Sequence, residues 1–297
     1  GNHFLCWVVF GALVSAPYLD AWPAFFLRVF GGLGMIVSML LDCLDGMQAR
    51  RTGKSSKLGA CLDHWLDAIN VPLAIAGTVL SLGLDPWTVA AATGAAVLVY
   101  NGQVTVYNER DRFIHPPGVD GALAGTGGGV LMIVFAGLLL FFPMTTRWVA
   151  VGITGVVWCV NVVQFKIAWW YLREIRMKGP HLMTIGTIVA IIALTGFEAI
   201  SPLAGALALV FLSFRLSGTL VLFTVIAKPA ARWDLTLVIW LIAICLSEWS
   251  IGDYTFRGYQ LENSVPYLGM LYVVTANLVD LGKHAPELTG DAHQTTA

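Results

Sequence analysis

The chain has 297 residues, of which 57% are hydrophobic and only 12% are charged, and its formal net charge at pH 7 is -1. Soluble proteins carry about 25% charged residues, so this composition indicates an integral membrane protein and excludes an ordinary soluble domain. A net charge near zero, without a long run of basic residues, also argues against nucleic acid as a partner.

Ten apolar segments have about the length that a membrane-spanning helix requires. Such a helix needs about 20 mostly apolar residues, whereas no stretch sustains the alternation of polar and apolar residues that is typical of strands or a membrane barrel. We therefore predict an all-α fold, a polytopic membrane helical bundle of about ten transmembrane helices. The predicted spans are residues 4–19, 24–48, 59–83, 86–108, 122–143, 148–172, 181–199, 203–227, 233–250 and 264–282.

Basic residues recur in every second loop between these segments. Residues 50–57 hold four of them, whereas the loops on the other side carry only Arg147 and Arg257. By the positive-inside rule, residues 50–57 and both chain ends are predicted to face the cytoplasm. The expected location is a multi-pass position in a bacterial inner membrane or an endoplasmic reticulum-type membrane.

Four carboxylates lie close to the loop at residues 50–57, on the second and third predicted spans. Asp42 and Asp45 are three residues apart and Asp63 and Asp67 are four apart, so each pair shares one helix face. A carboxylate near hydrocarbon is costly unless a partner holds its charge. Two such faces turned toward each other would form a cage of hard oxygen ligands, which suits Mg2+ or Mn2+ better than zinc.

Small and basic residues accompany the carboxylates at fixed offsets. Gly46 and Ala49 lack bulk and would let a nucleotide lie against the backbone, and Arg50 offers a forked guanidinium for a phosphate oxygen. The alternative is a set of helix-end acids that are solvated at the interface and paired with the basic residues of the 50–57 loop. The fixed offsets of glycine and alanine from the acids favour the metal site.

Residues 42–67 read D-x2-D-G-x2-A-R-x8-G-x3-D-x3-D. This pattern resembles the signature of the CDP-alcohol phosphotransferase family. The resemblance implies two Mg2+ ions that bind the pyrophosphate of a CDP-linked substrate. Their ligands would be Asp42, Asp45, Asp63 and Asp67. The residues that the resemblance places around the CDP moiety are Asp42, Gly46, Ala49, Arg50 and Gly59.

Two segments are similar to the choline/ethanolamine branch of that family. Residues 50–59 read R-R-T-G-K-S-S-K-L-G, like the A-R-R-T-x-x-S-S-P-L-G run of the branch, and residues 63–70 resemble its D-H-G-C-D-S-I/L-N run. Four helices after a six-helix core also resemble the eukaryotic type more than the compact bacterial enzymes. The resemblance thus implies a catalytic core at residues 1–178, then four additional transmembrane helices and a polar tail at residues 179–297.

His64 and Asp67 are the two candidates for the general base. In the choline/ethanolamine branch the histidine after the third aspartate is the proposed base for the diacylglycerol hydroxyl, and an imidazole of near-neutral pKa suits that task. In the branch that uses CDP-diacylglycerol, the fourth aspartate is the usual candidate. His64 lies about 100° around the helix from Asp63, so it could instead pack to the side.

Several positions bear on the substrates. Ala60 stands where the choline/ethanolamine branch usually has Glu, and Trp65 replaces a glycine, so we expect a different acceptor pocket. Gln103, Tyr107 and Glu109 occupy the place of a headgroup-shaping segment in the related branch and are candidates for headgroup contacts. A plain interfacial aromatic belt explains Tyr107 equally well.

We therefore expect metal-dependent transfer of a phospho-alcohol group from CDP-choline or CDP-ethanolamine to diacylglycerol, which releases CMP and forms a phospholipid. The alternative keeps the chemistry but has CDP-diacylglycerol donate to serine, inositol or glycerol phosphate, with Arg110 and Arg112 near a phosphorylated acceptor. A remote alternative is an ion-coupled transporter. The expected partners are a CDP-linked substrate and a lipid acceptor, and the glycine runs at residues 31–34 and 125–129 fit close packing or a homodimer.

Overall fold

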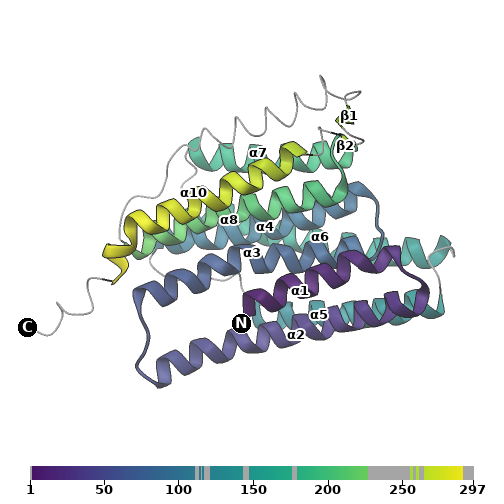
Figure 1. Cartoon of the computed structure of the whole chain (residues 1–297), viewed down its shortest axis with the longest axis horizontal. Coiled ribbons are helices and arrows are strands. Elements are labelled where there is room, and N and C mark those ends of the chain that lie inside the picture. Colours follow the sequence, from purple (N-terminus) through teal and green to yellow (C-terminus); the bar gives the residue numbers. More distant parts are fainter. Residues whose placement is uncertain are drawn as a thin grey trace, which may run out of the picture.

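The computed structural model describes residues 2–110, 114, 116, 121–142, 147–175, 179–226, 255–256, 259–260 and 264–289. Long helices dominate this part of the chain and lie side by side in an elongated bundle (Figure 1). They are α1 (Asn2–Ser15), α2 (Ala21–Arg51), α3 (Lys57–Ser81), α4 (Pro86–Arg110), α5 (Gly121–Phe141), α6 (Arg147–Glu174), α7 (Gly179–Gly196), α8 (Pro202–Val225) and α10 (Ser264–Thr289). A short 3-10 helix, η1 (Ala16–Tyr18), follows α1.

Four of the described helices, α2, α4, α6 and α8, are long and apolar enough to cross a membrane. Residues 129–141 of α5 and 181–196 of α7 form shorter apolar stretches. The predicted helical membrane fold is confirmed, but the number of ten transmembrane helices is not. Helix α1 has only 14 residues, and the predicted span at 233–250 lies outside the described residues.

The exception to the helical fold is a hairpin of two very short strands. β1 (Thr255–Phe256) pairs antiparallel with β2 (Tyr259–Gln260). Threonine and aromatic residues favour extended backbone. Two residues are too few to show the alternation by which a strand is recognised in a sequence, so the pattern gave no sign of this hairpin.

Large apolar side chains cover the outward faces of α2 and α6. Phe26 and Leu33 on α2 are 63% and 51% exposed, and Trp148 and Val163 on α6 are 80% and 55% exposed. A continuous apolar surface of this extent is unusual for a protein surrounded by water, whereas lipid chains solvate it well. The structure therefore agrees with the composition that this is an integral membrane protein.

Helix α1 packs against both α2 and α3, and α5 packs along α2 (Figure 1). The contact between α2 and α5 is close enough to be made by the backbones. A Cβ atom built on Gly32 would lie 2.8 Å from the carbonyl oxygen of Gly129, and one on Gly129 would lie 2.7 Å from that of Gly32. Members of the two predicted glycine runs thus serve close helix packing within one chain.

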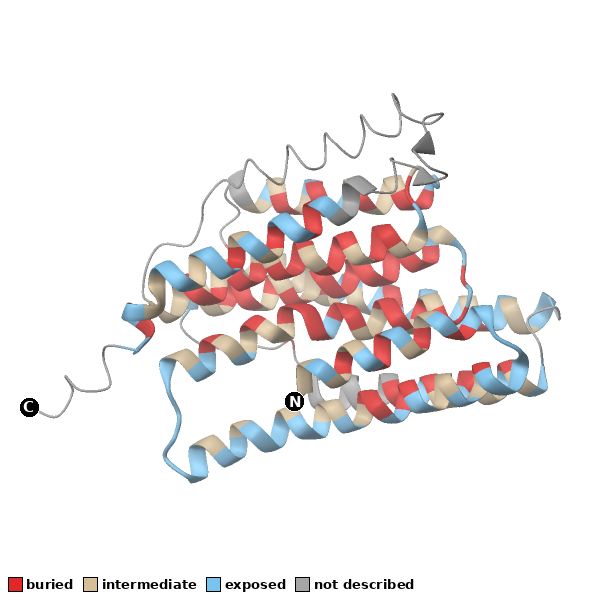
Figure 2. Ribbon diagram, in the orientation of Figure 1, coloured by how far each residue is buried: buried red, intermediate tan, exposed pale blue. Residues whose placement is uncertain are grey.

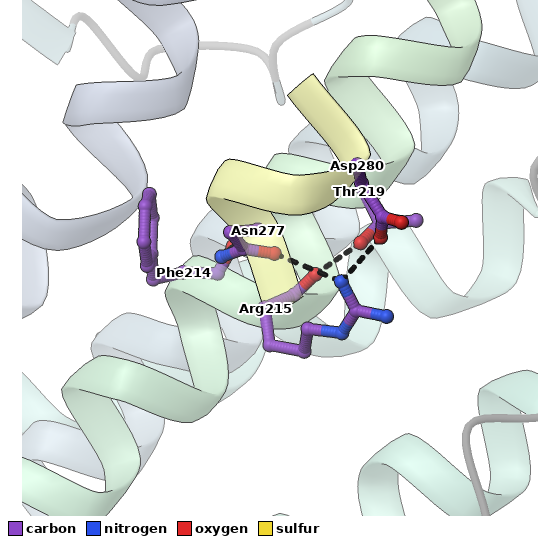
Figure 3. A network of polar contacts seen from close by, with 5 residues as sticks. All are labelled: Phe214, Arg215, Thr219, Asn277 and Asp280. Atoms are coloured by element: carbon purple, nitrogen blue, oxygen red, sulfur yellow. Dashed lines mark hydrogen bonds and ion pairs between the residues drawn. The ribbon is translucent and has the colours of Figure 1, made fainter. Parts of the chain in front are cut away.

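Helix α8 occupies the interior of the bundle, where it packs against α3, α4, α7 and α10 (Figure 2). Arg215 on α8 donates hydrogen bonds to Asn277 (3.0 Å) and Asp280 (2.6 Å) on α10, and Asn277 donates to the carbonyl of Phe214 (3.2 Å; Figure 3). A lone arginine within an apolar bundle would be costly, so these partners explain how α8 carries one. The network ties α10 to α8.

Candidate metal and nucleotide site

A short connection turns the chain from α2 into α3 and brings the carboxylates together. Helix α2 ends at Arg51, where the hydroxyl of Thr52 donates to the carbonyl of Gln48 (2.9 Å) and Gly53 adopts a left-handed φ of 64°. Ser56 then begins α3, because its hydroxyl accepts a hydrogen bond from the backbone N–H of Gly59 (3.0 Å). The end of α2 therefore lies beside the start of α3.

Three of the four predicted ligands meet at this junction. Oxygen atoms of Asp42, Asp45 and Asp63 all lie within 4.8 Å of one another, and Asp45 and Asp63 are exposed while Asp42 is half-buried. At such a separation two carboxylates repel each other by about 4 kcal/mol at the dielectric typical of a protein surface. A cation among them would convert this repulsion into attraction.

Asp67 lies outside this group of three but remains linked to it. It follows Asp63 by one helical turn on the same face of α3 and is half-buried. Its carboxyl group lies near enough to Asp42 and Asp63 to interact with both electrostatically. The structure thus places the fourth predicted ligand one turn deeper along α3 than the cluster.

The cluster has the chemistry that a divalent magnesium-like ion requires. Mg2+ binds hard oxygen ligands at about 2.1 Å, so neighbouring ligand oxygens are roughly 3 Å apart and opposite ones roughly 4 Å apart. The observed spacing of up to 4.8 Å approaches these values. Asp42, Asp45 and Asp63, with Asp67 beside them, could therefore hold Mg2+ or Mn2+.

The predicted nucleotide residues of α2 lie on the turn that follows the carboxylates. A Cβ atom built on Gly46 would lie 3.6 Å from Nη1 and 4.0 Å from Nη2 of Arg50, so the guanidinium lies over the glycine. Ala49 is half-buried next to it. A cation over an uncovered stretch of backbone is suited to a phosphate group.

Gly59, which the sequence assigned to the CDP moiety, has a local role at the start of α3. Its N–H is the donor to the Ser56 cap, and a Cβ atom there would lie 3.1 Å from the Ser56 hydroxyl oxygen. Ser56 was missed as a site residue, although a serine three residues before a helical glycine is a readable start signal. A small residue at position 59 keeps that cap undisturbed.

His64 lies on the flank of the cluster that faces α4. The centre of its ring is 6.2 Å from that of Tyr107, and it interacts electrostatically with Asp63. Its backbone carbonyl accepts a hydrogen bond from the hydroxyl of Tyr100 (2.5 Å), a buried residue that the sequence analysis missed. His64 is therefore half-buried between the carboxylates and α4.

The candidate headgroup residues on α4 divide into two groups. Gln103 and Tyr107 are one turn apart and half-buried on the side of His64, whereas Glu109 is exposed at the end of the helix. Arg110 pairs with Glu174 on α6 at 2.8 Å, and Arg112 lies outside the described residues. The structure brings Tyr107 and His64 together.

A family model described as CDP-alcohol phosphatidyltransferase matches residues 4–172, which is more than half of the chain. The chain belongs to this family. The matched segment contains the four aspartates and His64, so the predicted family, a family of transferases, is confirmed.

Curated relatives of this family member are choline- and ethanolamine-type phosphotransferases. Cholinephosphotransferase 1 of Gallus gallus is 34% identical over 83 residues, 27% of this chain and 25% of that protein. Cholinephosphotransferase 1 of Saccharomyces cerevisiae is 23% identical over 185 residues, which are 60% of this chain and 42% of that protein. Choline/ethanolaminephosphotransferase 2 of Arabidopsis thaliana is 32% identical over 96 residues, which are 31% of this chain and 25% of that protein. The matches span between a quarter and about two fifths of these relatives.

Proposed function

We propose that this protein transfers a phospho-alcohol group from CDP-choline or CDP-ethanolamine to diacylglycerol, releasing CMP and forming a phospholipid. The observation that carries the proposal is the meeting of Asp42, Asp45 and Asp63 within 4.8 Å at the α2–α3 junction, with His64 on its flank. The names of the curated relatives support choline or ethanolamine as the headgroup.

The carboxylates have a binding role in this proposal. Asp42, Asp45, Asp63 and Asp67 would hold Mg2+ ions, two by resemblance to the family, or Mn2+ in their place. When bound, such an ion offsets negative charge on the pyrophosphate and on the departing CMP. Arg50 would hold a phosphate oxygen by its guanidinium fork, while Gly46 and Ala49 leave room for the nucleotide against α2.

The chemical step is a displacement at the phosphorus that carries the headgroup. The hydroxyl oxygen of diacylglycerol attacks this phosphorus, its bond to the CMP oxygen breaks, and CMP leaves with the electron pair. The proton of the hydroxyl passes to a base, which we propose is the ring of His64, with Asp67 as the alternative. Tyr107 and Gln103 lie on the side of His64 from which the headgroup would be contacted.

Several further features belong to this proposal. We expect the α2–α3 junction to face the cytoplasm, where the basic loop at residues 50–57 is favoured. Residues 1–178 would form the catalytic core and residues 179–297 the additional helices and tail. The active form is proposed to be a homodimer.

One observation favours a second candidate, in which CDP-diacylglycerol is the donor and a polar alcohol the acceptor. Ala60, and not glutamate, follows Gly59 at the exposed start of α3. For a phosphorylated acceptor such as glycerol phosphate, however, Arg110 already has Glu174 as its partner. Asp42, Asp45 and Asp63 lie in the last third of α2 and the first third of α3, toward the helix ends, which weighs against an ion-coupled transporter.

A donor panel tests the proposal. The purified protein in lipid nanodiscs is given Mg2+ with CDP-choline or CDP-ethanolamine plus diacylglycerol, or with CDP-diacylglycerol plus serine, inositol or glycerol phosphate. We expect CMP and a labelled phospholipid with the first two donors, and neither with an Asp42→Asn control. If CDP-diacylglycerol were the only donor in the panel to release CMP, the assignment would move to the second candidate. If no donor released CMP, both candidates would be overturned.

A further inference from the structure

A group of polar side chains lies where α1 meets α2 and α3, next to the carboxylates. The indole N–H of Trp7 donates to Nε2 of His3 (3.0 Å), and Nδ1 of His3 bonds to the side-chain oxygen of Asn70 (2.7 Å). Asn70 itself is buried, with 9% of its surface exposed. Polar side chains inside a membrane bundle are costly and mark sites of function more often than surface ones do.

A second chain of hydrogen bonds runs beside the first. The hydroxyl of Ser38 on α2 donates to the side-chain oxygen of Asn2 (2.6 Å), and the thiol of Cys6 contacts the Ser38 oxygen at 3.1 Å. Because the Ser38 proton is used toward Asn2, the thiol is the donor in this contact. We call these six residues the α1 polar cluster: Asn2, His3, Cys6, Trp7, Ser38 and Asn70.

The protons of the cluster can be assigned from the donors alone. An indole nitrogen can only donate, so Nε2 of His3 is the acceptor and Nδ1 carries the proton that reaches Asn70. The amide oxygen of Asn70 is thus occupied, while its amide nitrogen makes no hydrogen bond among the described residues. Ser38 likewise occupies the amide oxygen of Asn2, whose amide nitrogen makes no hydrogen bond among the described residues. Each chain of hydrogen bonds therefore ends in an amide NH2 group, which can only donate.

The cluster continues the carboxylate site toward the interior of the bundle. Ser38 precedes Asp42 by one turn of α2, and Asn70 follows Asp67 by one turn of α3, so each lies on the same helix face as its aspartate. The thiol of Cys6 lies near enough to both aspartates to interact with them electrostatically. The two groups therefore lie next to each other along α2 and α3.

We propose that the α1 polar cluster binds the ester carbonyl oxygens of a glycerolipid, with the amide NH2 of Asn70 as the main donor. This inference rests on the proposed function. An ester carbonyl is an acceptor without a proton, so it complements a site that offers only donors. In a diacylglycerol the carbonyl oxygens lie a few bonds from the free hydroxyl, a distance comparable to the rise of about 4.5 Å along α3 that separates Asn70 from Asp67.

An ether lipid provides the test, because a dialkylglycerol has the same hydroxyl and chains but no carbonyl oxygens. We expect the wild-type protein to use diacylglycerol with about tenfold higher kcat/KM than dialkylglycerol, as the loss of one or two hydrogen bonds implies. Asn70→Leu should bring this ratio close to one while the KM for CDP-choline stays unchanged. Asn70→Asp, which keeps the oxygen that faces His3 but replaces the NH2 by an acceptor, should have the same effect and covers the case in which Asn70→Leu does not fold.

Thr78→Val is the matched control. Thr78 is a polar residue farther along α3, and its hydroxyl bonds to the carbonyl of Ala74 (2.8 Å) and to the sulfur of Met35 (3.6 Å), neither of which belongs to the cluster. The control should keep the wild-type ratio. Equal use of ester and ether lipids by the wild type, or an unchanged ratio in a folded Asn70→Asp variant, would overturn the inference.

Two lipids carry the same esters, and separate arms distinguish them. One arm compares diacyl- and dialkylglycerol with CDP-choline, and the other compares CDP-diacylglycerol with its dialkyl analogue and serine as acceptor. If one arm shows a preference for the ester lipid over the ether lipid, and this preference is lost in the Asn70 variants, the result supports the site. The arm that shows it identifies the lipid that the site binds. If neither arm turns over, the proposed function fails, and the site is then judged by thermal stabilisation: equal stabilisation by diacyl- and dialkylglycerol would overturn it.

Discussion

We expect the carboxylates of the α2–α3 junction to affect stability and turnover in opposite directions. Asp63→Asn removes a proposed metal ligand and one of three clustered carboxylates, while keeping the size of the side chain. We expect CMP release to fall at least about 10³-fold, and the melting temperature without divalent ions to stay equal or rise by a few degrees. Mg2+ should stabilise the wild type more than the variant.

A thermal-shift titration with Mg2+, alongside the CMP assay, checks this prediction. Asp20→Asn is a suitable control, because Asp20 is exposed at the start of α2 and makes no capping hydrogen bond. Equal Mg2+ stabilisation of Asp63→Asn and the wild type would show that the cluster does not bind the ion.

His64 and Asp67 can be separated by what each variant loses. A carboxylate committed to metal is a poor base, whereas we propose that the ring of His64, at the flank of the cluster, accepts the proton. We expect His64→Ala to lower kcat by about 10²–10⁴-fold while Mg2+ and CDP-choline still bind. Asp67→Asn should lose affinity for metal or nucleotide as well.

Turnover and calorimetric nucleotide binding, measured on both variants, decide between them. Near wild-type turnover of His64→Ala would make His64 a packing residue against Tyr107 and transfer the role of base to Asp67. In either case Asp67 lies one turn of α3 beyond Asp63 of the carboxylate cluster.

Among the elements, α3 and α8 pack along an extensive interface, to which Trp65 contributes one large side chain. Trp65 is buried, its ring centre lies 4.9 Å from that of Phe214, and a Cβ atom on Gly218 would overlap its indole. Trp65→Ala should lower the free energy of unfolding by about 3–5 kcal/mol by leaving a cavity. Gly218→Ala should destabilise the protein by overlap with the indole.

The double variant Trp65→Ala/Gly218→Ala checks that these two effects share one contact. Because alanine at position 218 has space once the indole is gone, the double variant should be no less stable than Trp65→Ala alone, and the cycle should be non-additive. Denaturation midpoints in one detergent give the comparison. Additive effects would show that α8 does not pack on Trp65.

The helix contacts show which features a sequence can predict and which it cannot. The α2–α3 junction was predictable, because its start signal, loop and aspartates lie within 26 residues and follow helical spacing. The contacts of Trp65 with Gly218, of His3 with Asn70 and of Arg215 with Asp280 join residues 65 or more positions apart. No local pattern encodes such pairings, so the sequence offered Trp65 only as a departure from a motif.

At the scale of the whole molecule, the helices on both sides of the predicted division at residue 178 share one core. Helix α8 packs against α3 and α4, and Asn101 and Asn108 of α4 bond to Ser217 (3.3 Å) and Thr224 (2.6 Å) of α8. The helices that carry the candidate site therefore pack on an element that the family match does not reach. Removing α8 would uncover polar and apolar groups that now lie inside the bundle.

We therefore expect a chain ending at residue 178 to be inactive, although it contains the four aspartates and His64. Co-expression with a separate chain of residues 179–297 should restore part of the CMP release, because the contacts that join the two parts are not covalent. A 179–297 chain carrying Gly218→Leu is the matched control, since leucine at that position meets the indole of Trp65 and should restore less. Full activity of residues 1–178 alone would show that α8 covers the core without supporting it, and that the geometry of the carboxylates and His64 is set by α1 to α6.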